Sequence, residues 1–324
     1  MNIIIAAGGT GGHVFPAVCV ANELKKHKVC VRFVSDERGK KYLADYENSA
    51  IIQRINTSSR FKLYISLLKN TLLSFSILKR DKPLAIIGFG GYPAVPCVLA
   101  AQILRKKTVI FEQNAVVGGA NKMLSKFSSL IVTAFENTKN LKQSDKLCFI
   151  GNPTRFESIY DKINDKKNDK FTILIIGGSQ GAQIFSQIEE KLLTKIENDD
   201  IIICRQAAGG FFANIEELYQ QTDLVIARSG AATIFELIGF HKPAILVPYK
   251  KSINGDQLEN ALFLSRNNAA ITIDESEINK VPEIVSELMQ NTEKIENMKE
   301  NLRKLYRKNI TEKAVAKLLK VINT

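Results

Sequence analysis

The feature that most restricts the fold of this chain is a glycine-rich turn near its start. The apolar run Ile3–Ala6 leads into Gly8-Gly-Thr-Gly-Gly-His13, and apolar residues resume at Val14. This order predicts a buried strand, a tight turn and a helix, because glycine lets backbone N–H groups approach an anion closely. The turn lacks the Lys-Ser/Thr pair of a P-loop, and Val14 stands where a dinucleotide fingerprint has its third glycine. We therefore expect a phosphate-binding turn of another kind, with His13 beside it as a titratable base.

Short β-branched runs alternate with helical segments along the chain, which is typical of parallel α/β sheets. The runs are Ile3–Ala6, Val29–Val34, Ile51–Ile55, Ala85–Ile87, Thr108–Phe111 and Leu130–Thr133, then Thr172–Ile176, Ile201–Cys204, Leu224–Ile226, Ala244–Val247 and Ala270–Ile273. The charged stretch 161–170 separates the two series. We predict an α/β chain of two Rossmann-like domains, residues 1–153 and 154–324, that face a cleft. The helical tail from Thr292 should pack back on the N-terminal domain.

Charge and cysteine usage limit the partners. The net charge of +12 predicts an anionic partner, whether nucleic acid, a negative membrane surface or a charged substrate. No dense Lys/Arg block and no tryptophan are present, so we expect no nucleic-acid binding. The five cysteines stand singly without metal-ligand spacing and should be reduced core residues. No Lys or Arg precedes Lys25, which argues against a signal peptide and for a cytoplasmic location.

Two segments are apolar enough to suggest a membrane. The stretch 84–104 has no charged residue, but five glycines and prolines in its middle favour a strand, a turn and a buried helix. The segment 60–80 is rich in Leu, Ile and Phe, with cations at both ends and in the middle. Such a helix suits an anionic membrane interface, and a buried crossover helix fits the same pattern.

Three further small-residue turns follow predicted strands. They are Gly88-Phe-Gly-Gly-Tyr-Pro93, Gly177-Gly-Ser-Gln-Gly-Ala182 and Arg228-Ser-Gly-Ala-Ala-Thr233. With two turns in each predicted domain, a diphosphate held by several helix N-termini is a plausible common purpose. Glu236 follows the last turn, where a carboxylate can accept two hydrogen bonds from a ribose diol. Gln257 and Asn260 share one face of a predicted helix, and amides suit sugar hydroxyls.

The ordered motifs resemble one known family. They are Gly8-Gly-Thr-Gly-Gly-His-Val-Phe-Pro16, Gly88-Phe-Gly-Gly-Tyr92, Glu112-Gln-Asn114, Gly151-Asn-Pro153 with Arg155, Gly177-Gly-Ser-Gln-Gly-Ala182, Arg228-Ser-Gly230, and Gln257 with Asn260. Over nearly the whole chain this series is similar to the MurG family of peptidoglycan N-acetylglucosaminyltransferases. The resemblance implies a GT-B glycosyltransferase that transfers GlcNAc from UDP-GlcNAc, with inversion, to undecaprenyl-pyrophosphoryl-MurNAc-pentapeptide (lipid I), giving lipid II.

The resemblance also implies roles by motif position. His13 would be the catalytic base. Residues expected to contact UDP-GlcNAc are Thr10, Gly11, Gly12, Asn114, Arg155, Ser179, Phe211, Phe212, Ala231, Ala232, Thr233, Glu236, Gln257 and Asn260. Among these, Arg155 and the two phenylalanines would address uracil, Glu236 the ribose, and Ser179 with Ala231–Thr233 the diphosphate. Gly8, Gly9, Gly90, Gly91 and Tyr92 would lie on the acceptor side, in the lipid I-binding and membrane-associating domain.

The implied enzyme works without a cofactor. No Asp-x-Asp occurs in the sequence, so we expect metal-independent transfer in which helix dipoles and turn N–H groups hold the diphosphate. The implied location is peripheral, on the cytoplasmic face of the inner membrane. The stretch 205–210 is shorter than the connection that the family has before the region of Phe211 and Phe212.

Three rival classes stay open. One is another GT-B enzyme such as a UDP-GlcNAc 2-epimerase, which would share the donor site. The second is a nicotinamide-dependent oxidoreductase, supported by Asp36 at the end of the second predicted strand, where a ribose-binding acid would lie. The third is a basic membrane-binding protein without activity, for which four ligand-type turns would have no purpose.

Overall fold

The computed structural model describes residues 1–9, 11–46, 48–53, 59–163, 169–177, 182–196, 200–206 and 214–323. By their internal contacts they divide into two compact units. The first consists of Met1–Arg155 together with Asn309–Thr324, and the second of Phe156–Lys308.

The described residues of the first unit form a parallel sheet of seven strands, in the order β3-β2-β1-β4-β5-β6-β7. The strands are β1 (Asn2–Ala6), β2 (Cys30–Ser35), β3 (Ala50–Ile51), β4 (Ala85–Gly88), β5 (Lys107–Glu112), β6 (Leu130–Thr133) and β7 (Leu147–Phe149). The helices are α1 (Gly11–Lys26), α2 (Glu37–Lys40), α3 (Arg60–Asp81), α4 (Ala94–Ile103), α5 (Gly119–Leu124), the 3-10 turn η1 (Ser125–Phe127) and α13 (Ile310–Asn323). Ile and Val fill the central strands because β-branched side chains pack well on a pleated surface covered by helices.

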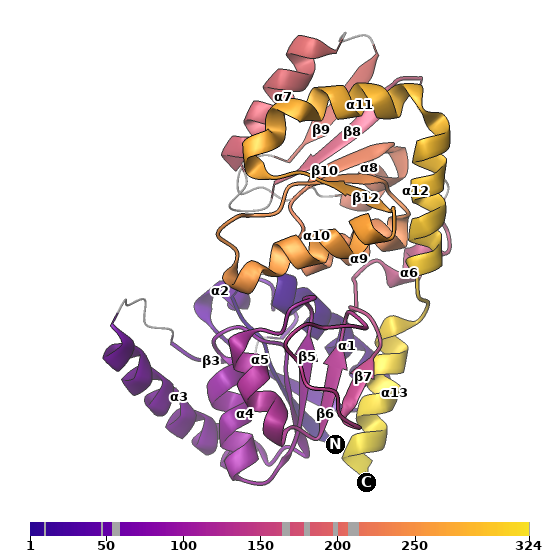
Figure 1. The fold of residues 1–324 in the computed structure, drawn as a ribbon. Coiled ribbons are helices and arrows are strands. Elements are labelled where there is room, and N and C mark those ends of the chain that lie inside the picture. Colours follow the sequence, from indigo (N-terminus) through magenta and orange to yellow (C-terminus); the bar gives the residue numbers. More distant parts are fainter. Residues whose placement is uncertain are drawn as a thin grey trace. The chain divides into compact units, whose positions relative to one another are not determined.

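Apolar clusters cover both faces of this sheet. On one face Ile3, Ile5 and Phe33 pack with α1, and on the other Ile4, Ile86 and Ile110 pack with α4. The first cluster also contains residues from the end of the chain, namely Ile310, Ala314, Val315 and Leu318 of α13. Figure 1 shows α13 beside α1 in the first unit. The last helix is therefore part of the N-terminal core.

The described part of the second unit is a five-stranded parallel sheet in the order β12-β11-β10-β8-β9. Its strands are β8 (Phe171–Ile176), β9 (Ile201–Arg205), β10 (Leu224–Ala227), β11 (Ala244–Leu246) and β12 (Ala270–Thr272). Its helices are α6 (Glu157–Tyr160), α7 (Ala182–Lys195), α8 (Ile215–Gln221), α9 (Ala231–Phe240), η2 (Ile253–Gly255), α10 (Asp256–Arg266), η3 (Glu275–Lys280), α11 (Val281–Gln290) and α12 (Thr292–Leu305).

Each sheet has one position where the strand order reverses. In the first unit it lies between β1 and β4, and in the second between β8 and β10. Ligands of open α/β sheets bind outside the carboxyl ends of the strands at such a position. The four small-residue turns follow these four strands. The topology thus brings the two turns of the first unit together. In the second unit, residues 178–181 of the turn after β8 lie outside the described residues.

The two-domain parallel fold predicted from the sequence is confirmed, and two strands differ from the prediction. The strand expected at 51–55 is only Ala50–Ile51, and Arg54 and Ile55 lie outside the described residues. Strand β7 was not predicted, because its three half-buried residues carry too short a pattern. The uncharged stretch 84–104 is a strand, a turn and a short helix, as predicted.

Candidate active site

The two glycine turns of the first unit interlock at the β1–β4 reversal. Gly91 has a φ of +73°, and a Cβ added there would lie 2.4 Å from the carbonyl oxygen of Gly8. A Cβ at Gly8 would in turn lie 2.6 Å from Cγ of Pro93. Phe89 N donates a hydrogen bond to Ala6 O (2.9 Å), which fixes the start of the second turn against the end of β1. Both turns therefore need glycine at their contact.

His13, in the first turn of α1, lies against the second glycine turn. A Cβ at Gly90 would lie 2.9 Å from His13 Cδ2 and 3.0 Å from Nε2. Nδ1 is buried and has no hydrogen-bond partner within the described ranges. Burial lowers the pKa of His13 below its ordinary 6.5, the charge of Asp36 raises it, and Arg38 lowers it further. The imidazole is therefore neutral near pH 7, as a proton acceptor must be.

Asp36 fixes the first glycine turn by a hydrogen bond to its backbone. Its Oδ1 accepts hydrogen bonds from Gly9 N (2.8 Å) and Gly39 N (2.9 Å), and the residue is 2% exposed. The second of these bonds caps the short helix α2. This use of the carboxylate removes the observation that favoured a nicotinamide oxidoreductase, because the side chain is buried and engaged.

Arg38 was not predicted as a site residue. Its guanidinium lies 3.5 Å from Oδ2 of Asp36, and a Cβ at Gly9 would come within 3.3 Å of Nη2. The side chain is 54% exposed, so the cation borders the glycine turn and also reaches solvent. A residue three positions after the end of β2 gave no signal of this contact in the sequence.

A buried carboxylate organises the turn after β5. Glu112 accepts hydrogen bonds from Asn114 N (3.0 Å), Gly118 N (3.0 Å) and Asn121 Nδ2 (3.0 Å). The neighbouring Gln113 donates from Nε2 to Phe89 O (2.9 Å), so this segment also braces the second glycine turn. Asn114, predicted to contact substrate, is half-buried at the same end of the sheet. Its substrate contact stays a prediction.

In the second unit, a polar network fixes the turn that precedes α9. Ser229 Oγ donates to Gln257 O (2.7 Å), and Asn260 Nδ2 donates to Ser229 O (3.0 Å). Arg228 pairs with Glu275 (2.5 Å) and donates to Val247 O (3.0 Å). Asn260 is completely buried, so its amide supports the turn in this structure, and its predicted sugar contact stays a prediction.

Helix α9 begins at Ala231 directly after this turn. Gly230 at its N-cap supplies no side-chain cap, so the N–H groups of Ala231, Ala232 and Thr233 have no partner of that kind and form the positive end of the helix dipole. One turn later, the Tyr219 hydroxyl donates to Oε2 of Glu236 (3.1 Å), which orients a half-buried carboxylate. Gln257 Oε1 accepts from Tyr249 N (2.9 Å). The positive end of a helix dipole and an oriented acid thus lie on one element.

Several predicted site residues can be placed only in part. Thr10, Ser179, Phe211 and Phe212 lie outside the described residues. Arg155 belongs to the first unit, where its guanidinium lies 4.9 Å from the centre of the Phe15 ring. Tyr92 follows the second glycine turn, but its hydroxyl bonds to helix α3. Within the described ranges, no three His, Cys, Asp or Glu side chains are grouped as metal ligands.

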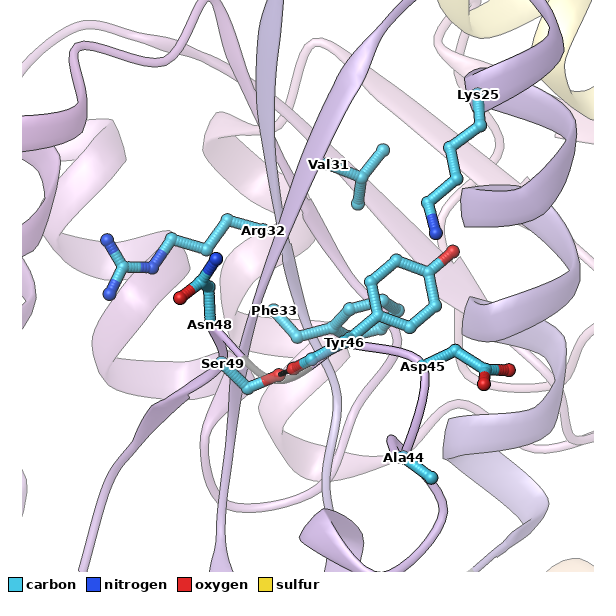
Figure 2. A pocket seen from close by; sticks show the side chains of 9 residues that line it. All are labelled: Lys25, Val31, Arg32, Phe33, Ala44, Asp45, Tyr46, Asn48 and Ser49. Carbon is cyan, nitrogen blue, oxygen red and sulfur yellow. Dashed lines mark hydrogen bonds between the residues drawn. The ribbon is translucent and has the colours of Figure 1, made fainter.

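A hollow of about 440 Å³ lies away from these turns, at the edge of the first sheet (Figure 2). Its lining residues are Lys25, Val31, Arg32, Phe33, Ala44, Asp45, Tyr46, Asn48 and Ser49. It exists because β3 pairs only with Val34 and Ser35, so the first half of β2 extends beyond its neighbour. In Figure 2 the Lys25 ammonium lies over the Tyr46 ring, 3.7 Å from its centre. No predicted site residue lines it, and we do not assign it to the active site.

Comparison with known proteins agrees with this geometry. The model of the glycosyltransferase family 28 N-terminal domain matches residues 3–133, and that of the family 28 C-terminal domain matches residues 205–317. The fold and the paired turns therefore define a two-domain glycosyltransferase. A crystal structure of MurG from Acinetobacter baumannii superposes with a TM-score of 0.81 at 27% identity, covering 98% of this chain and 99% of that one.

The chain belongs to the MurG family. It is 34% identical to the UDP-N-acetylglucosamine–N-acetylmuramyl-(pentapeptide) pyrophosphoryl-undecaprenol N-acetylglucosamine transferase of Rickettsia bellii, over 93% of this chain and 94% of the relative. A UDP-N-acetylglucosamine 2-epimerase structure also matches, with a TM-score of 0.71. At 11% identity that likeness shows the shared fold alone.

Proposed function

We propose that this chain transfers GlcNAc from UDP-GlcNAc to the C4 hydroxyl of lipid I, with inversion, and so forms lipid II. The observation that carries the proposal is His13, held neutral between two interlocked glycine turns at the β1–β4 reversal. The relative from Rickettsia bellii is named for the same transfer. A turn that holds both an anion site and a base suits an acceptor with a pyrophosphate and a hydroxyl to be deprotonated.

In this proposal the second unit binds the donor. The start of α9 faces the UDP diphosphate, Glu236 accepts from the ribose hydroxyls, and Gln257 contacts the sugar. Ser179, Phe211 and Phe212 complete the donor contacts of this unit. Residues of the first unit, namely Arg155, Thr10, Gly11, Gly12 and Asn114, are also proposed to contact UDP-GlcNAc. The helix dipole stabilises negative charge that grows on the leaving diphosphate, which is the part of the reaction that most needs electrostatic help.

The first unit binds the acceptor and supplies the base. Gly8, Gly9, Gly90 and Gly91 surround the acceptor pyrophosphate, and His13 takes the proton of the attacking hydroxyl. The new bond joins the acceptor oxygen to C1 of GlcNAc while the bond from C1 to the diphosphate oxygen breaks and UDP leaves with its electron pair. Attack opposite the leaving group inverts the anomeric centre in one step, and His13 then returns its proton to solvent.

The test is release of UDP from UDP-GlcNAc with and without a short-chain analogue of lipid I. We expect release that depends on the acceptor and is unchanged by EDTA, because the helix start and turn N–H groups replace a metal clamp. Loss of release in EDTA would overturn the metal-independent part. Release of UDP without acceptor, or isomerisation of UDP-GlcNAc, would overturn the proposed transfer and favour the epimerase class.

We further propose that the enzyme is peripheral on the cytoplasmic face of the inner membrane and does not bind nucleic acid. Phe61–Asp81 of α3 is long and apolar enough to cross a membrane by length and composition, one such helix among the described residues. Its outward side exposes Phe61, Tyr64, Leu68 and Leu72 by 59–73%. Exposed Lys62, Lys69, Lys79 and Arg80 accompany them, a combination that suits an anionic interface. The net charge of +12 then serves lipid headgroups.

Charge reversal of α3 should detach the enzyme from vesicles. In a flotation assay with anionic vesicles, a Lys62→Glu, Lys69→Glu, Lys79→Glu variant is expected to stay at the bottom, since each surface cation contributes about 1 kcal/mol. A Lys162→Glu, Lys251→Glu, Lys304→Glu variant carries the same charge change on exposed residues of the second unit and should float like the wild type. Equal flotation of both variants would overturn the role of α3.

A further inference from the structure

Helix α3 carries four uncharged polar residues on its inner side. Ser66, Asn70, Thr71 and Ser74 are 0–6% exposed, whereas large apolar residues of the same helix face outward. A helix that packs on a water-soluble domain normally shows the reverse arrangement. Figure 1 shows α3 along the outside of the first unit, where it packs on α4. Hydrogen bonds from Ser66 and Asn70 therefore contribute to the attachment of the first half of α3 to the domain.

These hydrogen bonds converge on one hydroxyl. Tyr92 OH lies 2.7 Å from Ser66 Oγ and accepts from Asn70 Nδ2 at 2.9 Å. Asn70 Nδ2 also donates to Gln53 O (2.9 Å). The other two inner hydroxyls only bond back to their own helix: Thr71 Oγ1 to Leu67 O and Ser74 Oγ to Asn70 O, both at 2.8 Å. Tyr92 is therefore the side chain through which α3 contacts the second glycine turn.

On the side away from α3, the second glycine turn is closely packed against His13 and the first glycine turn. Gly91 precedes Tyr92 directly and backs onto Gly8 O, and Gly90 lies against the His13 ring, each too close for a Cβ. Packed groups this close move together, since interiors transmit small shifts instead of absorbing them. A shift of α3 that moves Tyr92 therefore also moves Gly90, which contacts His13, and Gly91, which contacts the first turn.

We propose that Tyr92 is a positioning residue. When α3 binds to lipid, Tyr92 shifts the glycine turn that contacts His13, and this shift changes kcat/KM for the acceptor. This inference rests on the proposed function for its chemistry, and it gives Tyr92 a partner in α3 in place of the acceptor. Vesicle binding then acts on turnover even when the acceptor itself is not in the vesicle.

The first test uses a short-chain, water-soluble acceptor and vesicles of equal parts phosphatidylglycerol and phosphatidylcholine. In the wild type the vesicles should raise kcat/KM for the acceptor, and in Tyr92→Phe the gain should shrink by about fivefold, the typical contribution of one hydrogen bond. KM for UDP-GlcNAc should not change. Ser74→Ala is the control, because its hydroxyl is also on the inner side of α3 but bonds only within that helix. No vesicle effect in the wild type, or an undiminished one in Tyr92→Phe, would overturn the proposal.

Hydrogen exchange gives a second readout that does not depend on transfer. On the same vesicles, amides of 60–74 should gain protection in both wild type and Tyr92→Phe, while those of 88–92 should gain it in the wild type alone. Coupled protection without any transfer would reject the proposed function and keep the coupling. Transfer with equal protection of 88–92 in both proteins would reject the coupling and keep the function.

Discussion

Replacing His13 by alanine is expected to lower kcat by about 100- to 10,000-fold and to leave KM for UDP-GlcNAc nearly unchanged. The reason is that His13 is proposed to act on the acceptor hydroxyl only, in the first unit, while the donor contacts lie mainly in the second. Steady-state kinetics with both substrates varied separates the two effects. His27→Ala is a matched control, because that imidazole is half exposed at the end of α1 beside Glu23. Unchanged kcat with a raised donor KM would make His13 a binding residue.

The pH dependence follows from the same residue. Burial lowers the pKa of His13 below its ordinary 6.5. We therefore expect kcat/KM to stay constant from neutral pH to below pH 6.5 and to fall when the pH reaches the lowered pKa. Stability should follow the same direction: the unfolded chain takes up the proton first as the pH drops below 6.5, so folding free energy is lost toward acid pH. His13→Gln should flatten the acid side of both profiles. A profile that His13→Gln leaves unaltered would assign the titration to another group.

The Gly91→Ala variant is expected to lose about 2–4 kcal/mol of stability and most of its acceptor-dependent turnover. A left-handed φ of +73° disfavours alanine, and the new methyl group would lie 2.4 Å from the Gly8 carbonyl, which is backbone and has no rotamer to escape into. The turn must shift, and His13 shifts with it. Denaturant unfolding and UDP release measure the two effects.

The matched control for this variant is Gly119→Ala. Gly119 is the first residue of α5, and a Cβ there meets nothing within 4 Å. Its stability should change by less than about 0.5 kcal/mol. If Gly91→Ala proved as mild as this control, the two glycine turns would be separable and their interlocking would have no functional weight.

Most of the fold was predictable because its signals are local. The run Ile3–Ala6 followed by glycines is a strand and a turn in almost any α/β context, and the reversal of strand order follows from right-handed crossovers. Strand β7 is only Leu147–Phe149, too short for a local pattern to define it, and β3, expected over 51–55, is only Ala50–Ile51. They exist because the sheet beside them offers an edge to pair with, which is information from the tertiary structure.

The site was predictable in its turns and less so in their supports. The glycine spacing indicated positions where the backbone approaches a neighbouring group closely. In the structure, Gly8 and Gly91 approach each other. Asp36 supported a rival class in the sequence because an acid after the second strand fits two roles, and the hydrogen bond from Gly9 decides between them. Likewise, the sequence could not reveal that Asn260 is buried beneath Ser229.

Because α13 packs in the first unit, it also sets the order in which the two units can complete their folding during synthesis. Ile310, Ala314, Val315 and Leu318 belong to the same apolar cluster as Ile3 and Val14, so the core that contains the first strand is completed by residues that follow the second unit in the sequence. Residues 156–308 have left the ribosome before that happens, and the second unit contains its own complete core. The amino-terminal unit is thus finished after the carboxy-terminal one, and a nascent chain that stops before residue 310 leaves one side of α1 bare.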